Sequence, residues 1–498
     1  MIRTLAFKEL HEILLSPKFV VIFAVSTALV LLSAYTGVTG YSEEVSEYRI
    51  AEQLNRDSLR QGSWGEMRDP GATVIRSPSP LSVVVQGVQG VMGRKTDAGM
   101  INPRVRESRN MVYPVFAVFG GLDLAFVVAT VLSLFAILLS YDMISGEKER
   151  GTLKLLLAGG VSRAEVLAGK MIGGYLSLVV PFAVPLLLAA LLFALYPSVG
   201  WTGADWARFV LIIVFAVLYL AVFFVLGLLV SALTSRPATS FLVLLLIWVC
   251  AVAIAPRASV LVASQISPAP SYDQLLLEQE SLSRDLRGQM AERITDEVNE
   301  RIRQAGLAER MAQGEQVQQE VQNTIAAARE DIRNQIEGDL NQRLADSFED
   351  FARRQARLVS TARALSRVSP TSAFSFAAQT MAGTDVKTQE RFVRAVQSYR
   401  EGYLAYIAAQ AEAHPDQVQG GTNVNVGMSA GPQGPQINFS QSEMVHELDL
   451  SGMPEFRTML APVGSSLRAA TPDLVVLTLM LAAALVACYA AFRRYDPR

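Results

Sequence analysis

The sequence predicts an all-α polytopic membrane protein. We expect six transmembrane helices, an N-terminal amphipathic elbow helix and a large, mainly helical extracytoplasmic domain between spans five and six. Only 18% of the 498 residues are charged and 51% are hydrophobic, whereas roughly a quarter are charged in a typical soluble domain. Six apolar segments each approach the length of about 20 residues that a helix needs to cross the hydrocarbon core. The polar residues gather between the fifth and sixth segments.

Composition also excludes several classes of protein. The net charge of −2 is not basic enough for nucleic acid to be the main partner. Cys250 and Cys488 lie in apolar runs, so neither a disulfide framework nor a CxxC metal site is expected. His11, His414 and His446 are too far apart in sequence to suggest a metal site or a Ser/His/Asp triad. We therefore expect no enzyme activity in this chain, and no catalytic, cofactor-binding or metal-binding residues.

The spans follow from the apolar runs. We place them at 19–38, 116–141, 171–196, 209–233, 238–255 and 474–492. The first is an uncleaved anchor rather than a signal peptide, because Glu9 and Glu12 lie in its flank and no small-residue cleavage site follows. An even number of spans puts both ends of the chain on one side.

Basic residues indicate which side that is. Short connections rich in Lys and Arg stay in the cytoplasm, and the connection 142–170 carries Lys148, Arg150, Lys154, Arg163 and Lys170. We therefore place both termini in the cytoplasm and the chain in the cell inner (plasma) membrane. The cytoplasmic parts are then 1–18, 142–170 and 493–498, and the outer parts are 39–115, 197–208 and 256–473.

The outer segment 271–367 reads as long helix, because it is polar and poor in Gly and Pro. Its apolar residues recur mostly every four positions, which is closer to an eleven-residue repeat than to a heptad. Gly306 and Gly314 flank a break. We expect an antiparallel helical hairpin standing off the membrane; a helical lid folded on itself is the alternative.

The rest of the outer insertion is less regular. Shorter helices are expected over 370–411, after Pro370. The Gly-, Asn- and Gln-rich stretch 415–440 predicts a loop, with short strands such as 423–426. Thr471-Pro472-Asp473 has the pattern of an N-cap, a first-turn proline and a first-turn acid, which predicts the start of span six.

The N-terminal segment 1–18 predicts a short amphipathic helix. Ala6, Leu10, Ile13 and Leu14 recur at helical spacing, and Pro17 then turns the chain into span one. We expect this helix to lie in the inner membrane interface. A cytosolic extension of span one is the alternative.

The connection 142–170 carries the most readable pattern. Gly146 and Gly151 punctuate a charged turn, and Thr152 is placed to cap a short leucine-rich helix that Gly159-Gly160 ends. Ser162 with Glu165 is a capping box that starts the next helix. A small apolar helix flanked by charge suits docking into a groove of another protein. The alternative is a solvated loop whose leucines touch only the lipid interface.

This pattern resembles the permease subunits of type-2 ABC exporters. The similarity rests on Asp142, the string SGEKERGTLKLLL and the following GVSRAEVLAGK. It extends to the branch with a large extracytoplasmic insertion before the last span, and to permeases of copper-enzyme maturation. RTLAFKELHEILLSPKF resembles the N-terminal elbow of the family, and Ser369-Pro370-Thr371 with Met381 to Thr384 resembles a stretch of that branch. The hairpin carries no motif that we can assign.

The resemblance implies a mechanism. Residues 146–157 would be the coupling helix, resting on a separate ABC ATPase subunit. The ATPase-coupling residues implied are Glu147, Lys148, Glu149, Arg150 and Thr152, with Leu153 and Leu156 as apolar anchors. Two permeases, as copies or paralogues, and two ATPases would form the working unit.

ATP and Mg²⁺ are expected on the partner ATPase. This chain has no phosphate loop, because the nearest string, Ala164 to Lys170, lacks the first glycine and is followed by Met171.

Some features inside the spans bear on transport. Pro181 and Pro185 each remove a backbone hydrogen bond and mark a candidate kink, either a flexing point or a static bend. Gly173-Gly174 and Gly227 would allow close helix contact. Asp123 is expected at the outer interface rather than in a proton relay.

The sequence therefore predicts an integral permease subunit of an ABC-type exporter, which couples ATP hydrolysis in a partner to movement of a substrate. The spans carry no ladder of charges, which argues against a small-ion pathway; lipid-like, peptide and protein cargo stay open. The alternative is an ABC-type mechanotransmitter or structural membrane protein, acting on a periplasmic or cell-envelope partner through the hairpin. Membrane lipid is the other expected contact.

Overall fold

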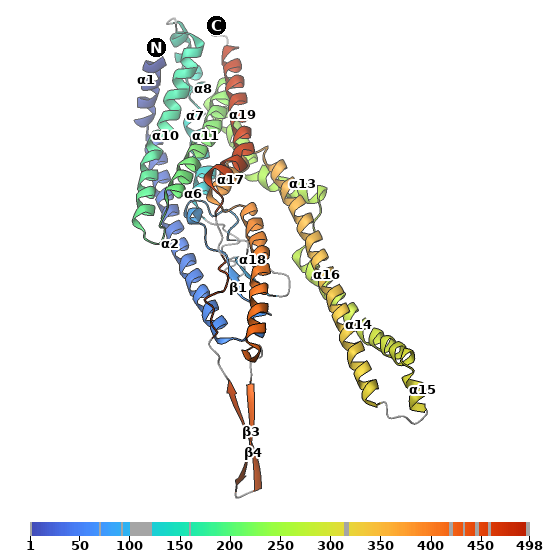
Figure 1. The fold of residues 1–498 in the computed structure, drawn as a ribbon. Coiled ribbons are helices and arrows are strands. Elements are labelled where there is room, and N and C mark those ends of the chain that lie inside the picture. The colour runs from blue at the N-terminus through green and yellow to red at the C-terminus, as the bar shows by residue number, and fades with distance from the viewer. Residues whose placement is uncertain are drawn as a thin grey trace. The chain divides into compact units, whose positions relative to one another are not determined.

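The computed structural model describes residues 2–68, 71–90, 93–99, 122–158, 161–312, 318–417, 422–431, 434–443, 448–456 and 460–494. The chain forms two compact units. The first consists of Met1–Arg257 and Ser366–Arg498, and the second of Ala258–Leu365. Among the described residues, six helices are long and apolar enough to cross a membrane, which confirms the all-α polytopic class (Figure 1).

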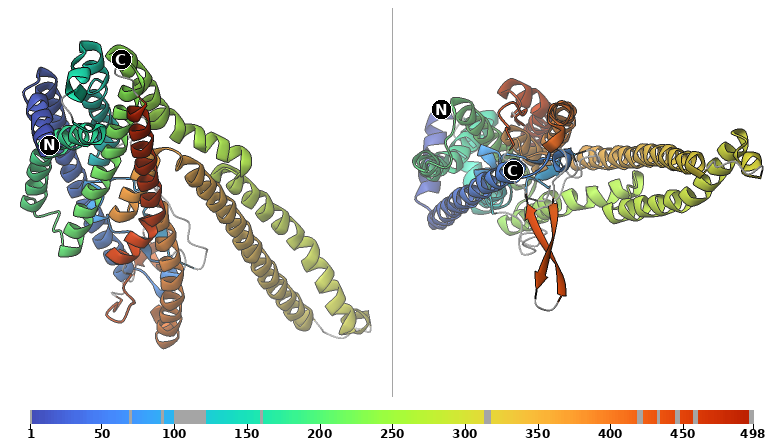
Figure 2. Two further views of the ribbon diagram at one scale, coloured as in Figure 1. Left: turned by 90° about the horizontal axis from the view of Figure 1, so that it is seen from above. Right: turned by 60° about the horizontal axis from the view of Figure 1, so that its bottom comes forward.

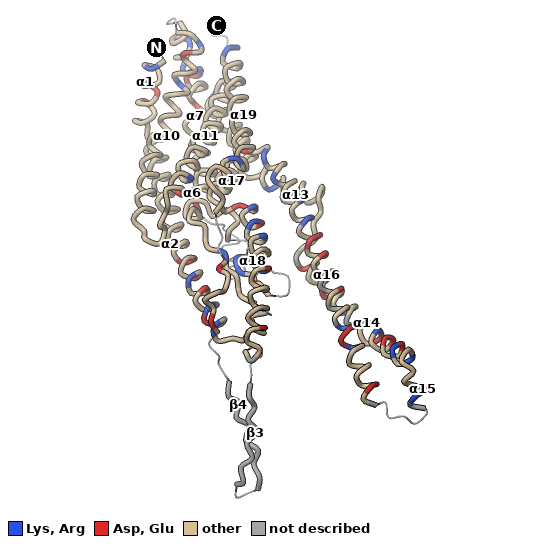
Figure 3. The backbone as a smooth tube through the Cα atoms, viewed as in Figure 1, with Lys and Arg blue, Asp and Glu red and all other residues tan. Residues whose placement is uncertain are grey.

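The candidate spans are built from these helices. They are α2 (Pro17–Gln61), the run α6 (Leu124–Phe126), η2 (Val127–Leu132) and α7 (Ser133–Ser140), α10 (Arg163–Leu195), α11 (Gly203–Leu233), the run α12 (Pro237–Trp248), η3 (Val249–Ile254) and α13 (Ala255–Ile266), and α19 (Val463–Arg493). In the first unit the two chain ends lie at the same end of the bundle (Figure 1). Charged residues are sparse along the middle of these helices (Figure 3).

The first span is much longer than the sequence analysis predicts. The expected loop 39–115 begins as a helix, because α2 continues without a break to Gln61. No Gly or Pro occurs between Gly40 and Gly62, so nothing stops the helix there. It is followed by α3 (Trp64–Arg68), β1 (Thr73–Ile75), the 3-10 helix η1 (Pro80–Val83) and β2 (Lys95–Asp97), and β1 pairs antiparallel with β2.

The start of span two is fixed by Asp123. Residues 116–121 of the expected span lie outside the described residues, and the helix begins at Leu124. The Asp123 carboxylate caps it, accepting from Phe126 N at 2.7 Å and from Gln86 N at 2.8 Å. The carboxylate is buried, so it serves as an N-cap that also holds the segment around Gln86.

The predicted start of span six is wrong. Helix α19 begins at Val463, and Pro472 lies inside it. The Thr471 hydroxyl donates to Leu467 O at 3.0 Å, as it does within a helix, instead of capping one. Asp473 is fully buried, with Oδ1 2.6 Å from Nε of Arg367. A tertiary ion pair therefore uses the acid that the local pattern assigned to a first turn.

Part of the predicted outer insertion belongs to the helix bundle. Helix α17 (Pro370–Ala382) packs against α11 and α19, and most of its residues are buried. It is capped by Ser369, whose hydroxyl also donates to Ala251 O of the π-helix η3 at 2.6 Å. With 13 residues it is about 20 Å long, which is too short to cross a membrane.

A buried tyrosine joins α17 to the other π-helix, η2. Tyr219 of α11 donates to Ala129 O of η2 at 2.7 Å, and its oxygen lies 3.0 Å from the Thr371 hydroxyl. Trp248 donates to Ser133, which in turn donates to the same Ala129 carbonyl. Hydroxyl groups thus satisfy carbonyls where the regular helical pattern is interrupted.

A second core lies beyond the bundle within the first unit. It packs α18 (Val386–Ala413) against α3 and β1 through Trp64, Met67, Val74, Phe392 and Tyr403. The 3-10 helix η4 (Pro415–Gln417) follows α18. Beyond it, β3 (Thr422–Gly431) pairs antiparallel with β4 (Gly434–Glu443), from Thr422 opposite Glu443 to Gly431 opposite Gly434. The strand predicted at 423–426 lies inside β3.

The second unit contains the predicted antiparallel hairpin. Its arms are α14 (Tyr272–Gln304) and α16 (Gln318–Ser366), with α15 (Leu307–Ala312) between them (Figure 2). Gly306 adopts a φ of +61° at the break, while Gly314 lies outside the described residues. Gln279 contacts Ser347 at 3.3 Å and Arg301 pairs with Asp331 at 2.8 Å, so the arms run in opposite directions.

Glycines permit close helix packing in the bundle, as the sequence analysis predicts. A Cβ on Gly173 of α10 would lie 2.3 Å from Ala6 O of α1 (Ile2–Leu14), and one on Gly227 would lie 1.8 Å from Ser140 Oγ. Helix α10 itself continues through Pro181 and Pro185.

Replacing Gly173 with alanine should therefore destabilise the protein. The new methyl meets backbone atoms of α1, and overpacking of this kind usually costs about 1–3 kcal/mol. We expect a lower thermal unfolding midpoint in detergent for Gly173→Ala. Gly464→Ala is the control, since a Cβ at Gly464 meets no atom within 4 Å. Equal midpoints for the two variants would contradict this account of the α1–α10 contact.

Candidate functional site

The predicted coupling segment forms two short helices at the end of the bundle that carries both termini (Figure 1). They are α8 (Ser145–Arg150) and α9 (Thr152–Ala158). Gly151 separates them with a φ of +75°, a left-handed conformation that favours glycine. Gly159-Gly160 lies outside the described residues. The capping box of Ser162 with Glu165 is confirmed at the start of α10.

A buried ion-pair cluster ties α8 to two other helices. Lys170 Nζ of α10 lies 2.7 Å from Glu147 Oε1 of α8 and 2.9 Å from Glu9 Oε1 of α1. All three side chains are buried, and that of Lys170 is only 3% exposed. Buried charges must be paired, because leaving one without a partner is strongly unfavourable. We call Glu9, Glu147 and Lys170 the buried triad.

Reciprocal capping joins α8 to the end of α11. The Ser231 hydroxyl of α11 accepts from Ile144 N at 3.1 Å and from Ser145 N at 2.9 Å, at the N-terminus of α8. Lys148 of α8 donates to Thr234 O at 3.0 Å, and also to Ala232 O, at the C-terminus of α11. Each helix thus satisfies free backbone groups of the other.

Helix α1 buries the predicted face, on which Leu10, Ile13 and Leu14 are partly buried, together with one acidic residue beside it. Ala6 is buried as expected, but Glu9 of the triad is buried too, and Phe7 is exposed. Contact with α10 decides this, because Leu5 and Ala6 lie against Gly169 and Gly173. Ser16 caps α2 through Phe19 N at 3.2 Å, so α1 and α2 are separate helices. Span one therefore does not extend to Ile2 as one continuous helix.

The predicted coupling residues divide into buried and exposed sets. Leu153 is fully buried and Glu147 belongs to the buried triad, so both side chains face the bundle. Lys148 and Leu156 are partly buried. The exposed ones are Glu149, Arg150 and Thr152.

Two further residues of this segment are exposed, although they are not among the predicted coupling residues. They are Lys154 and Leu155, and the Leu155 side chain is 75% exposed. Helical spacing from Leu153 places Leu155 about 200° away, on the opposite face. The run of leucines alone does not show which one faces the core. We call Glu149, Arg150, Thr152, Lys154 and Leu155 the handle surface.

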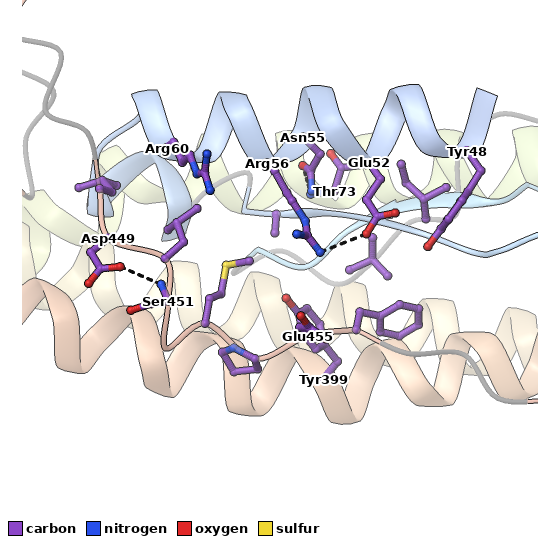
Figure 4. Close-up of a pocket in the computed structure, with 18 residues that line it drawn as sticks. Tyr48, Glu52, Asn55, Arg56, Arg60, Thr73, Tyr399, Asp449, Ser451 and Glu455 are labelled. Atoms are coloured by element: carbon purple, nitrogen blue, oxygen red, sulfur yellow. Dashed lines mark hydrogen bonds and ion pairs between the residues drawn. The ribbon is translucent and has the colours of Figure 1, made fainter. Parts of the chain in front are cut away.

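A large cavity lies at the other core of the first unit (Figure 4). It measures about 830 Å³ and is lined by the second half of α2, β1, α18 and residues 448–456. Arg56 pairs with Glu52 at 3.3 Å, and Asp449 Oδ1 accepts from Ser451 N at 2.9 Å. Burial raises the pKa of the Tyr399 hydroxyl to about 12, which keeps it neutral at physiological pH.

This cavity has a lining of mixed charge. Its acidic and basic groups are mixed, with Glu52 and Arg56 paired to each other. Within the described ranges, no group of three or more His, Cys, Asp or Glu side chains is placed to hold a metal ion. Its mixed polar lining is suited to contact with a polar molecule or segment.

The bundle and its clamped pair of short helices define a multi-pass membrane protein. A family model described as ABC-2 family transporter protein matches residues 3–497. The chain therefore belongs to this family, and the resemblance to type-2 ABC permeases is confirmed. A comparison with curated proteins finds no match to this chain.

Two neighbouring acids on α8 provide a test of the buried triad. Glu147→Ala removes one of the two carboxylates that pair with Lys170 and should lower stability by about 1.5–3 kcal/mol, the usual contribution of a hydrogen bond to a charged group. Glu149→Ala, two residues away and exposed, should change it little. Thermal unfolding in detergent measures both. A larger effect from Glu149→Ala would show that the triad is not formed in solution.

Proposed function

We propose that this chain is the permease subunit of an ABC-type exporter. It lies in the cell inner (plasma) membrane, and a separate ABC ATPase subunit that carries ATP and Mg²⁺ supplies the energy. The observation that supports this most strongly is the match to the ABC-2 transporter family across residues 3–497. The chain itself serves as a transport subunit and not as an enzyme.

The handle surface is the contact for the ATPase in this proposal. Glu149, Arg150 and Lys154 offer charges of both signs, and Leu155 offers an exposed apolar side chain for a groove. Glu147 and Lys148 transmit movement instead of making the contact, because they join α8 to α1, α10 and α11. Force on α8 would then reach three helices of the bundle at once.

Basic residues support a cytoplasmic position for this end. Lys18 pairs with Asp142 at 2.6 Å beside the start of α2, and Arg163 donates to Arg493 O near the end of α19. Short basic segments are retained in the cytoplasm, so both termini and the handle surface face the ATPase there.

A second permease, identical or paralogous, completes the transporter. Exposed apolar residues on α10 and α12, such as Leu187, Leu191, Leu242 and Leu246, leave surface for lipid and for that second subunit. Homodimer and heterodimer are both compatible with this surface.

Substitutions in the handle surface should weaken assembly with the ATPase without affecting the folding of this chain. For the double variant Glu149→Lys with Leu155→Asp, we expect at least a tenfold loss of ATPase co-purification and of stimulated ATP hydrolysis, because contact charge and apolar area change together. Glu390→Lys, an exposed reversal on α18, is the control.

Thermal unfolding and gel filtration should be unchanged in both variants. Full ATPase association in the handle variant would contradict the assignment of the handle surface.

A mechanotransmitter is the second candidate, and the separate hairpin unit favours it. The hairpin buries a small core of Leu286, Ile332 and Ile336, while its outer faces carry many exposed charges. Such a helical pair is suited to binding a cell-envelope partner rather than to enclosing a substrate.

Shortening the hairpin distinguishes the two candidates. Residues 275–350 can be replaced by a short Gly/Ser linker, because Gln355 remains 2.9 Å from Pro270 O and holds the base together. An exporter should keep substrate movement and ATPase stimulation. A mechanotransmitter should keep ATPase stimulation but lose its envelope output. Loss of ATPase stimulation itself would contradict both, since neither assigns the hairpin to ATPase coupling.

A further inference from the structure

A second cavity of the first unit lies where three helices begin. It measures about 520 Å³, and its lining includes Thr202, Asp205 and Arg208 at the start of α11, Arg391 and Phe392 near the start of α18, and Pro462 and Val463 at the start of α19. Arg76, just after β1, completes it. Helix α19 runs 31 residues from this cavity to Arg493, so the cavity lies about 45 Å along that helix from the C-terminal end.

Positive charge dominates this cavity. Arg76, Arg208 and Arg391 all line it, and Asp205 is the single carboxylate among its described lining residues. Asp205 is engaged in the capping box of α11, where it accepts from Thr202 N at 3.0 Å and from the Thr202 hydroxyl at 2.6 Å. Three guanidinium groups facing one carboxylate leave an excess of two positive charges.

Two of these arginines are buried with donor atoms that have no partner. Arg76 is 7% exposed and Arg208 is 3% exposed. Among the described residues, Arg76 Nη2 and Arg208 Nε make no hydrogen bond. A buried donor without an acceptor is unfavourable, and a fixed one is ready to bind an acceptor supplied by a ligand.

Other contacts hold the two guanidinium groups in place. Arg76 Nη1 donates to Gln389, and its guanidinium lies 5.8 Å from the centre of the Phe392 ring. Arg208 Nη1 donates to Met381 O at 3.3 Å and Nη2 to Ala461 O. The neighbouring Glu44 accepts from Gln89 at 2.9 Å and pairs with Arg94 at 3.3 Å. The Glu44 carboxylate therefore already has partners other than Arg76.

Arg76 remains a cation at neutral pH. Burial and the nearby Arg94 lower its pKa to about 10, with Glu44 acting in the opposite direction. Its charge therefore has to be balanced inside the cavity. Arginine forks match the oxygen atoms of a phosphate group, because several N–H donors can meet several acceptors at once.

We propose that this cavity binds a phosphate group, with Arg76, Arg208 and Arg391 as its ligands. The group is carried either by an anionic lipid or by a soluble phosphate compound. The apolar lining, which includes Tyr41, Phe392 and Leu460, accommodates the remainder of such a molecule. This inference goes beyond the proposed function, since it does not involve the handle surface or the ATPase.

Two arginines on α18 provide a matched test. Arg391 lines the cavity, with Nη2 donating to the Thr388 hydroxyl of its own helix at 2.8 Å. Arg394, three residues later, is exposed, with Nε donating to Glu390 O of the same helix. Arg391→Gln should weaken phosphate binding about tenfold or more, as expected for loss of a charged hydrogen-bond donor. Arg394→Gln should leave binding unchanged.

Two probes distinguish the sources of phosphate. Native mass spectrometry of the full chain in mixed micelles compares dioleoyl phosphatidic acid with dioleoylglycerol, which lacks only the phosphate. Isothermal titration of the delipidated chain measures inorganic phosphate. Preferential retention of phosphatidic acid that is lost in Arg391→Gln supports a lipid ligand. A heat of phosphate binding that is seen with the unaltered chain and lost in Arg391→Gln supports a soluble ligand.

The proposal is overturned if neither probe shows a preference for phosphate, or if Arg391→Gln and Arg394→Gln bind both probes like the unaltered chain. Arg391→Lys keeps the charge and should retain part of the binding, which separates loss of a ligand from loss of folding. Association with the ATPase, measured on the same samples, should be unaffected. Failure of phosphate binding therefore leaves the proposed function untouched.

Discussion

The pairing of Lys170 with Glu9 and Glu147 is the interaction on which the terminal end of the bundle depends. Three ionised side chains from α1, α8 and α10 meet where water is nearly absent. None of them is tolerable there alone, since an unpaired buried charge is strongly unfavourable. The three helices are thus obliged to stay together. The short helix α8 is in this way made part of the bundle.

In the interior of the bundle, hydroxyl groups instead of charged groups connect the helices. Two π-helices interrupt the regular hydrogen bonding of spans two and five. Tyr219 and Ser369 supply donors to carbonyls of these segments; Tyr219 also contacts α17, and Ser369 caps it. Polar backbone groups at membrane depth need such partners. The irregular segments, α17 and α11 therefore form one connected structure.

The parts of the first unit away from the termini build two cavities with polar and charged linings. Continuation of α2 to Gln61 supplies one wall of the larger cavity. The starts of α11, α18 and α19 supply the smaller one, where buried arginines converge.

Local signals determined much of the architecture. Apolar runs were sufficient for the number of spans, since burial in lipid requires long apolar segments whatever their neighbours are. Capping at Ser162 and the break at Gly306 followed from side chains and glycine acting within one turn. The string between Asp142 and Lys170 was sufficient to indicate the family. By contrast, the start of span six at Val463, the burial of Glu9 and Leu153 and the packing of α17 in the bundle were decided by the tertiary structure alone. Each depends on contacts between residues far apart in sequence, such as Arg367 with Asp473 or Lys170 with Glu9, and no local pattern encodes which distant group will satisfy a buried charge.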